Sequence, residues 1–113
     1  MIKIYHNPRC SKSREVLEIL KSKSCHIEII EYLKNPPSFD EMKDLFIRLN
    51  LKPKDIIRQN ETLFKTNFKN KNFSDEEWIM ILIENPILIE RPIVVRKNKA
   101  LICRPPEIVL TLL

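Results

Sequence analysis

The chain has 113 residues, of which 43% are hydrophobic and 31% charged, and it carries a formal net charge of +5 at pH 7. This size predicts a single globular domain over residues 1–113, and no apolar run approaches the length of a membrane-spanning helix. The chain has no glycine, which excludes the glycine-rich loops that bind phosphates and dinucleotides.

The charge pattern also limits the possible partners. A net positive charge favours an anionic ligand, but the basic residues are scattered among acids, and we expect neither nucleic acid nor a membrane as partner. The three cysteines and two histidines show no paired spacing, so no metal site is expected. The N-terminus lacks the pattern of a secretion signal. We therefore expect a cytoplasmic protein with reduced cysteines.

The first third of the chain predicts a strand, a helix and a second strand. Residues 2–5 alternate apolar side chains, residues 11–22 place apolar side chains at helical spacing, and residues 27–32 form a second apolar run. Such a short unit predicts two parallel strands joined by a right-handed crossover.

The middle of the chain, about residues 38–85, predicts a helical insertion. Ser38 with Glu41 and Ser74 with Glu77 have the spacing of capping boxes, which mark two helix starts. Residues 60–73 read as a loop that can hold one helical turn. The expected buried side chains are Met42, Leu45, Phe46 and Leu49 in the first helix and Trp78, Ile81 and Leu82 in the second.

The last part of the chain predicts a β-hairpin and a helix. Two β-branched runs, 93–95 and 100–103, flank Asn98, the residue expected to take a left-handed conformation at the turn. An amphipathic helix follows Pro106. The complete order predicts an α/β fold of the thioredoxin-like type, with a four-stranded mixed sheet flanked by helices.

Cys10 has the surroundings of a reactive cysteine. It lies on the tight turn between the first strand and the first helix, with Ser11 and Ser13 available to cap that helix. The unpaired N–H groups at a helix start stabilise a thiolate, and such settings lower the pKa of a cysteine to roughly 3.5–7.5. The nearby cations are Arg9, Lys12 and Arg14.

The hairpin brings two arginines towards Cys10. With the turn centred at Asn98, Arg91 and Arg104 flank the same end of the hairpin. If the first hairpin strand pairs antiparallel with strand one, that end also meets His6 and Cys10. Two guanidinium groups aimed at one point form a clamp for an oxyanion. Pro92 is either an ordinary proline at a strand start or a cis proline beside the cysteine.

Several segments together resemble the glutaredoxin-coupled arsenate reductases, the ArsC-like family with a thioredoxin-like fold. Residues 5–14, which read YHNPRCSKSR, resemble the active-site segment of that family. Residues 31–37, 57–61, 85–95 and 103–107 look like further blocks of the family, in the family's order. The resemblance spans nearly the whole chain.

The resemblance implies an arsenate reductase, an oxidoreductase that reduces arsenate to arsenite through an adduct on the Cys10 thiolate. It implies Arg58, Arg91 and Arg104 as the residues that bind the oxyanion, and a supporting role for His6. It further implies no bound cofactor, glutathione as co-substrate and glutaredoxin as protein partner. From its own chemistry, His6 either tunes the thiol or is a polar residue that ends a strand.

Two other functions are compatible with this fold. One is a thiol/disulfide oxidoreductase that acts on mixed disulfides, and the other is a non-enzymatic regulator of the Spx type, which binds RNA polymerase. The Spx-type group usually has a second cysteine three residues after the first, where this chain has Ser13. Cys25, expected in a turn, and Cys103, expected at the end of a strand, are interpreted as structural.

Overall fold

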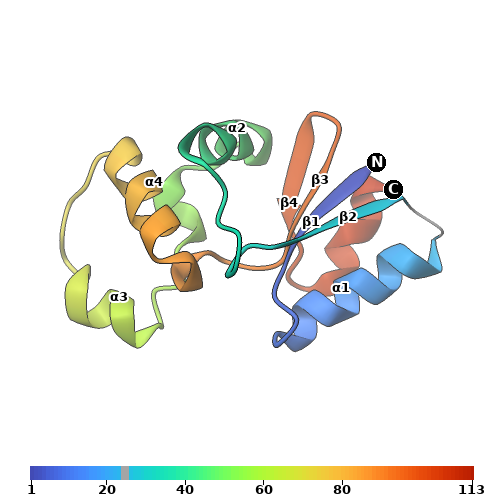
Figure 1. The fold of residues 1–113 in the computed structure, drawn as a ribbon, viewed down its shortest axis with the longest axis horizontal. Coiled ribbons are helices and arrows are strands. Elements are labelled where there is room, and N and C mark those ends of the chain that lie inside the picture. The colour runs from blue at the N-terminus through green and yellow to red at the C-terminus, as the bar shows by residue number, and fades with distance from the viewer. Residues whose placement is uncertain (24–25) are drawn as a thin grey trace. The chain divides into compact units, whose positions relative to one another are not determined.

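The computed structural model describes residues 1–23 and 26–113. The chain divides into two compact units, one formed by residues 1–35 and 91–113 and the other by residues 36–90. Figure 1 shows the helices and strands of both units. The second unit contains the whole predicted insertion of about residues 38–85. That residues 1–113 form one domain stays a prediction, and Cys25 lies outside the described residues.

The first unit is built on a four-stranded sheet with the order β2-β1-β3-β4. Its strands are β1 (Ile2–His6), β2 (Ile27–Glu31), β3 (Ile93–Arg96) and β4 (Lys99–Ile102). β1 pairs parallel with β2 and antiparallel with β3, and β3 pairs antiparallel with β4. The predicted mixed sheet is confirmed, and α1 (Ser11–Ser22) supplies the crossover between β1 and β2.

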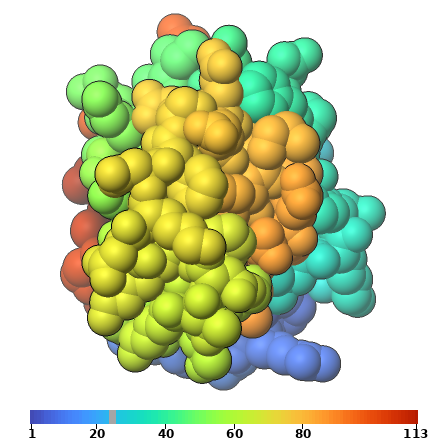
Figure 2. Space-filling model, turned by 90° about the vertical axis from the view of Figure 1, so that its left-hand side faces the viewer, coloured from blue at the N-terminus to red at the C-terminus, as the bar shows by residue number. Residues whose placement is uncertain are grey.

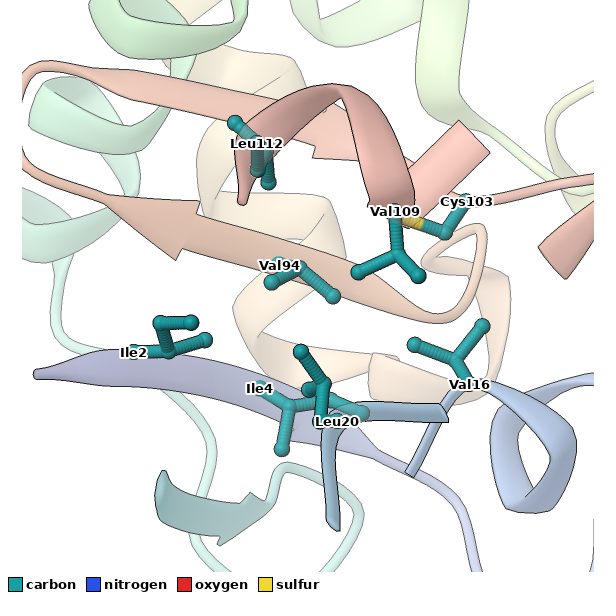
Figure 3. Close-up of a cluster of buried hydrophobic side chains, with 8 residues drawn as sticks. All are labelled: Ile2, Ile4, Val16, Leu20, Val94, Cys103, Val109 and Leu112. Carbon is teal, nitrogen blue, oxygen red and sulfur yellow. The ribbon is translucent and has the colours of Figure 1, made fainter. Parts of the chain in front are cut away.

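The core of this unit lies where α1 and the 3₁₀ helix η3 (Pro106–Leu112) pack on the sheet. Side chains two apart on a strand share a face, and side chains four apart on a helix share a face. Ile2 and Ile4 of β1 therefore lie in one buried cluster with Val16 and Leu20 of α1, and Figure 3 shows Ile4 beside Leu20. Val94, Cys103, Val109 and Leu112 complete the cluster.

The second unit is helical. It consists of α2 (Phe39–Leu49), η1 (Pro53–Ile56), α3 (Thr62–Asn67), α4 (Asp75–Glu84) and η2 (Pro86–Leu88). Both predicted capping boxes are present: the Glu41 N–H donates to Ser38 Oγ over 3.2 Å, and the Glu77 N–H donates to Ser74 Oγ over 3.1 Å. The four predicted core residues of α2 are all buried. Among the described residues, no helix is both long enough and apolar enough to cross a membrane.

The hairpin turn is centred between Lys97 and Asn98 rather than on Asn98. Ile93 pairs with Ile102, and Arg96 pairs with Lys99. The turn therefore has only two residues, and such turns place a positive φ at their first residue. That residue is Lys97, with φ of 55°, and the prediction that Asn98 takes the left-handed conformation is wrong.

The predicted amphipathic helix at the end of the chain is present as the 3₁₀ helix η3, with Val109 and Leu112 buried. Two other local predictions are wrong. In α4, Ile79 is buried and Ile81 only partly so. Ser11 and Ser13 do not cap α1, since Cys10 itself occupies the N-cap position and no side chain caps the helix.

The core position of Leu20 predicts a large and specific loss of stability. Leu20 is fully buried, whereas Leu110 of η3 in the same unit is 46% exposed. Leu20→Ala should lower the free energy of unfolding by about 2–5 kcal/mol because it leaves a cavity. Leu110→Ala should change it by less than about 0.5 kcal/mol. Urea titration followed by circular dichroism measures both, and equal losses would contradict this description of the core.

Candidate active site

Cys10 lies between the end of β1 and the start of α1. Its N–H donates to the Asn7 carbonyl over 3.0 Å, and its own carbonyl accepts from the Arg14 N–H over 3.0 Å, the first backbone bond of α1. Arg14 Nη1 donates to the Pro8 carbonyl over 2.9 Å and so ties the turn to the helix. These bonds hold the thiol at the positive end of the helix.

The pKa of Cys10 lies below the ordinary value of a cysteine. Burial raises the pKa and is the largest single influence, since it disfavours the thiolate. The other influences together outweigh it: the backbone N–H groups of Ser13 and Lys12 donate to the sulfur, and the Arg91 guanidinium acts through its charge and a hydrogen bond. The surroundings therefore favour a thiolate at a residue that is only 8% exposed.

Arg91 and Arg104 meet at this sulfur. Arg104 Nη1 lies 3.8 Å from Cys10 Sγ and also donates to the Arg91 carbonyl over 3.3 Å. Arg91 lies two residues before the start of β3 and is joined to Pro92 by a cis peptide bond, and Arg104 lies two residues after the end of β4. The predicted convergence of the two arginines on Cys10 is present, and of the two alternatives for Pro92 the cis form is observed.

His6 and Ser13 join the two sides of the cysteine turn. His6 Nδ1 lies 2.6 Å from Ser13 Oγ, and Ser13 Oγ accepts from the Asn7 N–H over 3.1 Å. The pKa of His6 is lowered from 6.5, chiefly by burial, with Arg14 and Lys21 adding to the shift and Glu31 opposing it. A neutral His6 can accept the Ser13 O–H at Nδ1, which leaves the other nitrogen, Nε2, with the proton.

The hydrogen bond between Ser13 and His6 is a feature that the sequence does not predict. Ser13 is fully buried, although serines are mostly exposed. Its hydroxyl links the last residue of β1 to the first turn of α1, on either side of Cys10. No spacing rule connects residues seven apart in two different elements, so only the fold could reveal the pair.

Arg58 lies in the second unit, where backbone pairing positions it. Ile57 forms an isolated antiparallel bridge with Ile89, and the Arg58 N–H donates to the Leu88 carbonyl over 2.8 Å. Its side chain is shared between two partners in the same unit: Nη2 lies 2.9 Å from Glu61 Oε1, and Nη1 donates to the Ile87 carbonyl over 3.3 Å. The spacing of Arg58 and Glu61, three residues apart, is the signal that could have revealed this pair.

Cys103 is also buried, but its pKa is shifted in the opposite direction from that of Cys10. It is fully buried in the core of the first unit, and burial raises its pKa to about 12. A thiol that stays protonated and shielded is a poor nucleophile, in agreement with the structural role predicted for it. Within residues 1–23 and 26–113, no group of three or more histidine, cysteine or acidic side chains could hold a metal ion.

Comparison with known proteins identifies the family. Residues 5–112 match the sequence profile of the ArsC family, and the chain belongs to this family. It is 39% identical to an arsenate reductase of Neisseria meningitidis over 94% of this chain and 92% of that protein. It is 45% identical to the uncharacterized protein YfgD of Escherichia coli K12, over 96% of this chain and 93% of that protein.

A solved structure agrees with the thioredoxin-like fold. The arsenate reductase from Vibrio cholerae superposes with a TM-score of 0.93 at 42% sequence identity, over 99% of this chain and 97% of that one. The predicted family and fold class are therefore confirmed.

The surroundings of Cys10 predict how its reactivity depends on pH. Its alkylation by iodoacetamide should follow a titration with a midpoint below that of a free cysteine, because the folded protein stabilises the thiolate. In the unfolded protein the midpoint should return to the ordinary value. Mass spectrometry of the peptides separates Cys10 from the other cysteines. In the folded protein, Cys103 should stay unmodified. A midpoint for Cys10 at the ordinary value would contradict the electrostatic account.

Proposed function

We propose that this protein is an arsenate reductase that uses Cys10 as its nucleophile and glutathione and glutaredoxin as its reductants. The observation that carries the proposal is the meeting of a thiol, Arg91 and Arg104 at the start of α1. Membership of the ArsC family and the names of the relatives support arsenate as the substrate.

The arginines supply the positive charge that the first step requires. A thiolate and an arsenate dianion repel each other, so the site must supply positive charge where the two meet. Guanidinium groups bind tetrahedral oxyanions through paired N–H donors, and donors fixed in place before the reaction stabilise the charge in the transition state. Arg91 and Arg104 do this from the first unit, and Arg58 is proposed as the third arginine on the strength of the family resemblance.

The proposed reaction begins with attack of the Cys10 thiolate on arsenic. An S–As bond forms, one arsenate oxygen leaves as water after protonation, and arsenic stays in the +5 state. The thiol of glutathione then adds to the same arsenic and displaces a second oxygen as water. His6 has a supporting role here, because its bond to Ser13 holds the cysteine turn in place.

The reduction follows when a glutaredoxin thiolate attacks the glutathione sulfur. The electron pair of the glutathione S–As bond stays on arsenic, which becomes As(III), and the two attacking thiols end as a mixed disulfide of glutaredoxin and glutathione. Water then cleaves the remaining bond to Cys10 and releases arsenite. The electrons balance, because two thiols are oxidised to one disulfide. We place this reaction in the cytoplasm, where thiols are kept reduced.

The oxyanion clamp predicts that the shape of the arginines matters as well as their charge. Arg91→Lys and Arg104→Lys should each lower kcat/KM for arsenate, on the order of 100-fold, because lysine loses the planar pair of donors. Arg58→Lys should also lower it. Arg48→Lys is the matched control and should leave it unchanged, because Arg48 is a half-buried residue of α2 that pairs with Asp44 in the same helix.

The measurement is arsenite formation from arsenate with glutathione, glutaredoxin and a reducing system. If all three lysine variants kept full activity, the clamp would be wrong. Inactivity of the wild type towards arsenate, together with reduction of mixed disulfides, would favour the thiol/disulfide oxidoreductase. Binding to RNA polymerase without either activity would favour the Spx-type regulator.

The position of the cysteines predicts dependence on an external thiol. Ser13 stands where a resolving cysteine would lie, and the buried Cys103 has its pKa raised to about 12. A Cys25→Ser, Cys103→Ser double variant should therefore keep most of the arsenate reduction with glutathione and glutaredoxin, whereas Cys10→Ser should have none. A folded but inactive double variant, or a Cys10–Cys103 disulfide formed during turnover, would rule out this mechanism.

A further inference from the structure

The second unit contains a cavity of about 600 Å³ that the proposed reaction does not use. Its walls come from η1, from the residues just before and after α3, from α3 itself and from α4. Figure 2 shows the face of the molecule on which α3 and the segment after it, yellow-green to yellow, lie beside α4, in orange. The chemistry of its lining is distinct from that of a hydrophobic core.

Four exposed lysines line this cavity: Lys54, Lys65, Lys69 and Lys71. The structure records no ion pair between any of them and another residue within the described ranges, whereas Lys12, Lys21 and Lys34 each lie beside a glutamate. Unneutralised lysines around a concave surface create a local positive potential. This cavity therefore favours a ligand with several negative charges.

Aromatic rings form the other part of the lining. Phe64 and Trp78 are buried with their rings stacked at 6.3 Å, and the half-buried Phe68 meets the edge of Trp78 at 6.4 Å. All three line the cavity. The packed rings hold Phe68 in place, so its partly exposed ring is a rigid surface for a flat, apolar group.

Side-chain amides complete the lining. Gln59, Asn60, Asn70 and Asn72 are exposed around the cavity, and no side-chain hydrogen bond of these amides to another described residue is recorded. Each amide carries two donors and one acceptor. Such groups can pair with the edge of a heterocyclic base, which presents donors and acceptors in the plane of the ring.

We propose that this cavity binds a nucleoside phosphate. The base lies against Phe68, its edge pairs with the amides, and the phosphates lie among the lysines, which bind phosphate as point charges. The volume falls within the roughly 300–1,000 Å³ of small-molecule sites. This binding activity is separate from arsenate reduction and does not depend on it.

Residues 64–73, which read FKTNFKNKNF, alternate aromatic and basic side chains. The expectation that the basic residues are only scattered does not hold for this segment, where Lys65, Lys69 and Lys71 lie between phenylalanines. A long single strand of nucleic acid fits less well, since strand-binding grooves stack successive bases on several exposed rings. Phe64 and Trp78 are buried, which leaves one partly exposed ring in the cavity and room for one base.

Trp78 makes the test direct, because it is the only tryptophan in the chain and lines the cavity. The wild-type protein is titrated with ADP and with GDP while the tryptophan emission is recorded, and calorimetry measures the same binding independently. We expect saturable binding. Lys65→Gln combined with Lys69→Gln should weaken it at least about tenfold, since each removes a contact to a charged group. Lys43→Gln combined with Lys99→Gln, two exposed residues outside the cavity, makes the same change of charge and should have no effect.

A second variant separates base from phosphate. Phe68→Leu should weaken ADP binding about five- to tenfold through lost stacking and leave pyrophosphate binding unchanged. The proposal is overturned if neither nucleotide binds at about 1 mM. It is also overturned if ribose 5-phosphate or poly-glutamate binds as well as ADP, since charge alone would then explain binding. Affinity for oligonucleotides that rises with their length would overturn it in favour of single-stranded nucleic acid.

Discussion

The antiparallel pairing of β1 with β3 determines where the chemistry of the first unit lies. Tyr5 pairs with Ile93, and Ile93 pairs with Ile102, so the end of β1, the start of β3 and the end of β4 share one edge of the sheet. Cys10 follows β1, and Arg91 and Arg104 lie just outside the other two strand ends. A parallel arrangement of β1 and β3 would place Arg91 at the opposite edge. The backbone topology therefore brings a thiol and two cations together before any side chain interacts.

At this end of the sheet, the pKa of Cys10 results from a balance between opposing effects. Burial alone would make the thiol less acidic, as it does for Cys103, whose pKa rises to about 12. The difference at Cys10 comes from donors aimed at the sulfur: two backbone N–H groups of α1 and the Arg91 guanidinium. Two buried thiols can thus have pKa values shifted in opposite directions, depending on which groups replace water around the sulfur. The bond between His6 and Ser13 links the end of β1 to the first turn of α1, on either side of Cys10.

The sequence predicts those features of the molecule that depend on local periodicity. The strands, the crossover, both capping boxes and the buried face of α2 follow from spacing rules that act within a few residues. The errors lie where a longer-range contact decides. Lys97 rather than Asn98 has the positive φ because strand pairing fixes a two-residue turn, and Ser13 bonds to His6 instead of capping its own helix. The position of Arg58 could not be derived either, because a bridge between Ile57 and Ile89 places it.

Arg104 and Arg58 differ in their contacts, and this bears on the proposed clamp. Arg104 directs Nη1 at the Cys10 sulfur. In the proposed reaction, its positive charge therefore lies beside the thiolate and the arsenate that the thiolate attacks. Arg58 lies 2.9 Å from a Glu61 carboxylate, and both side chains are mostly shielded from water, with exposed fractions of 21% and 26%. A cation already balanced by a carboxylate adds little net charge, but its remaining N–H donors are held in a fixed direction. In the proposed clamp, Arg104 therefore acts mainly through its charge, whereas the Glu61 pair makes Arg58 a donor of fixed orientation.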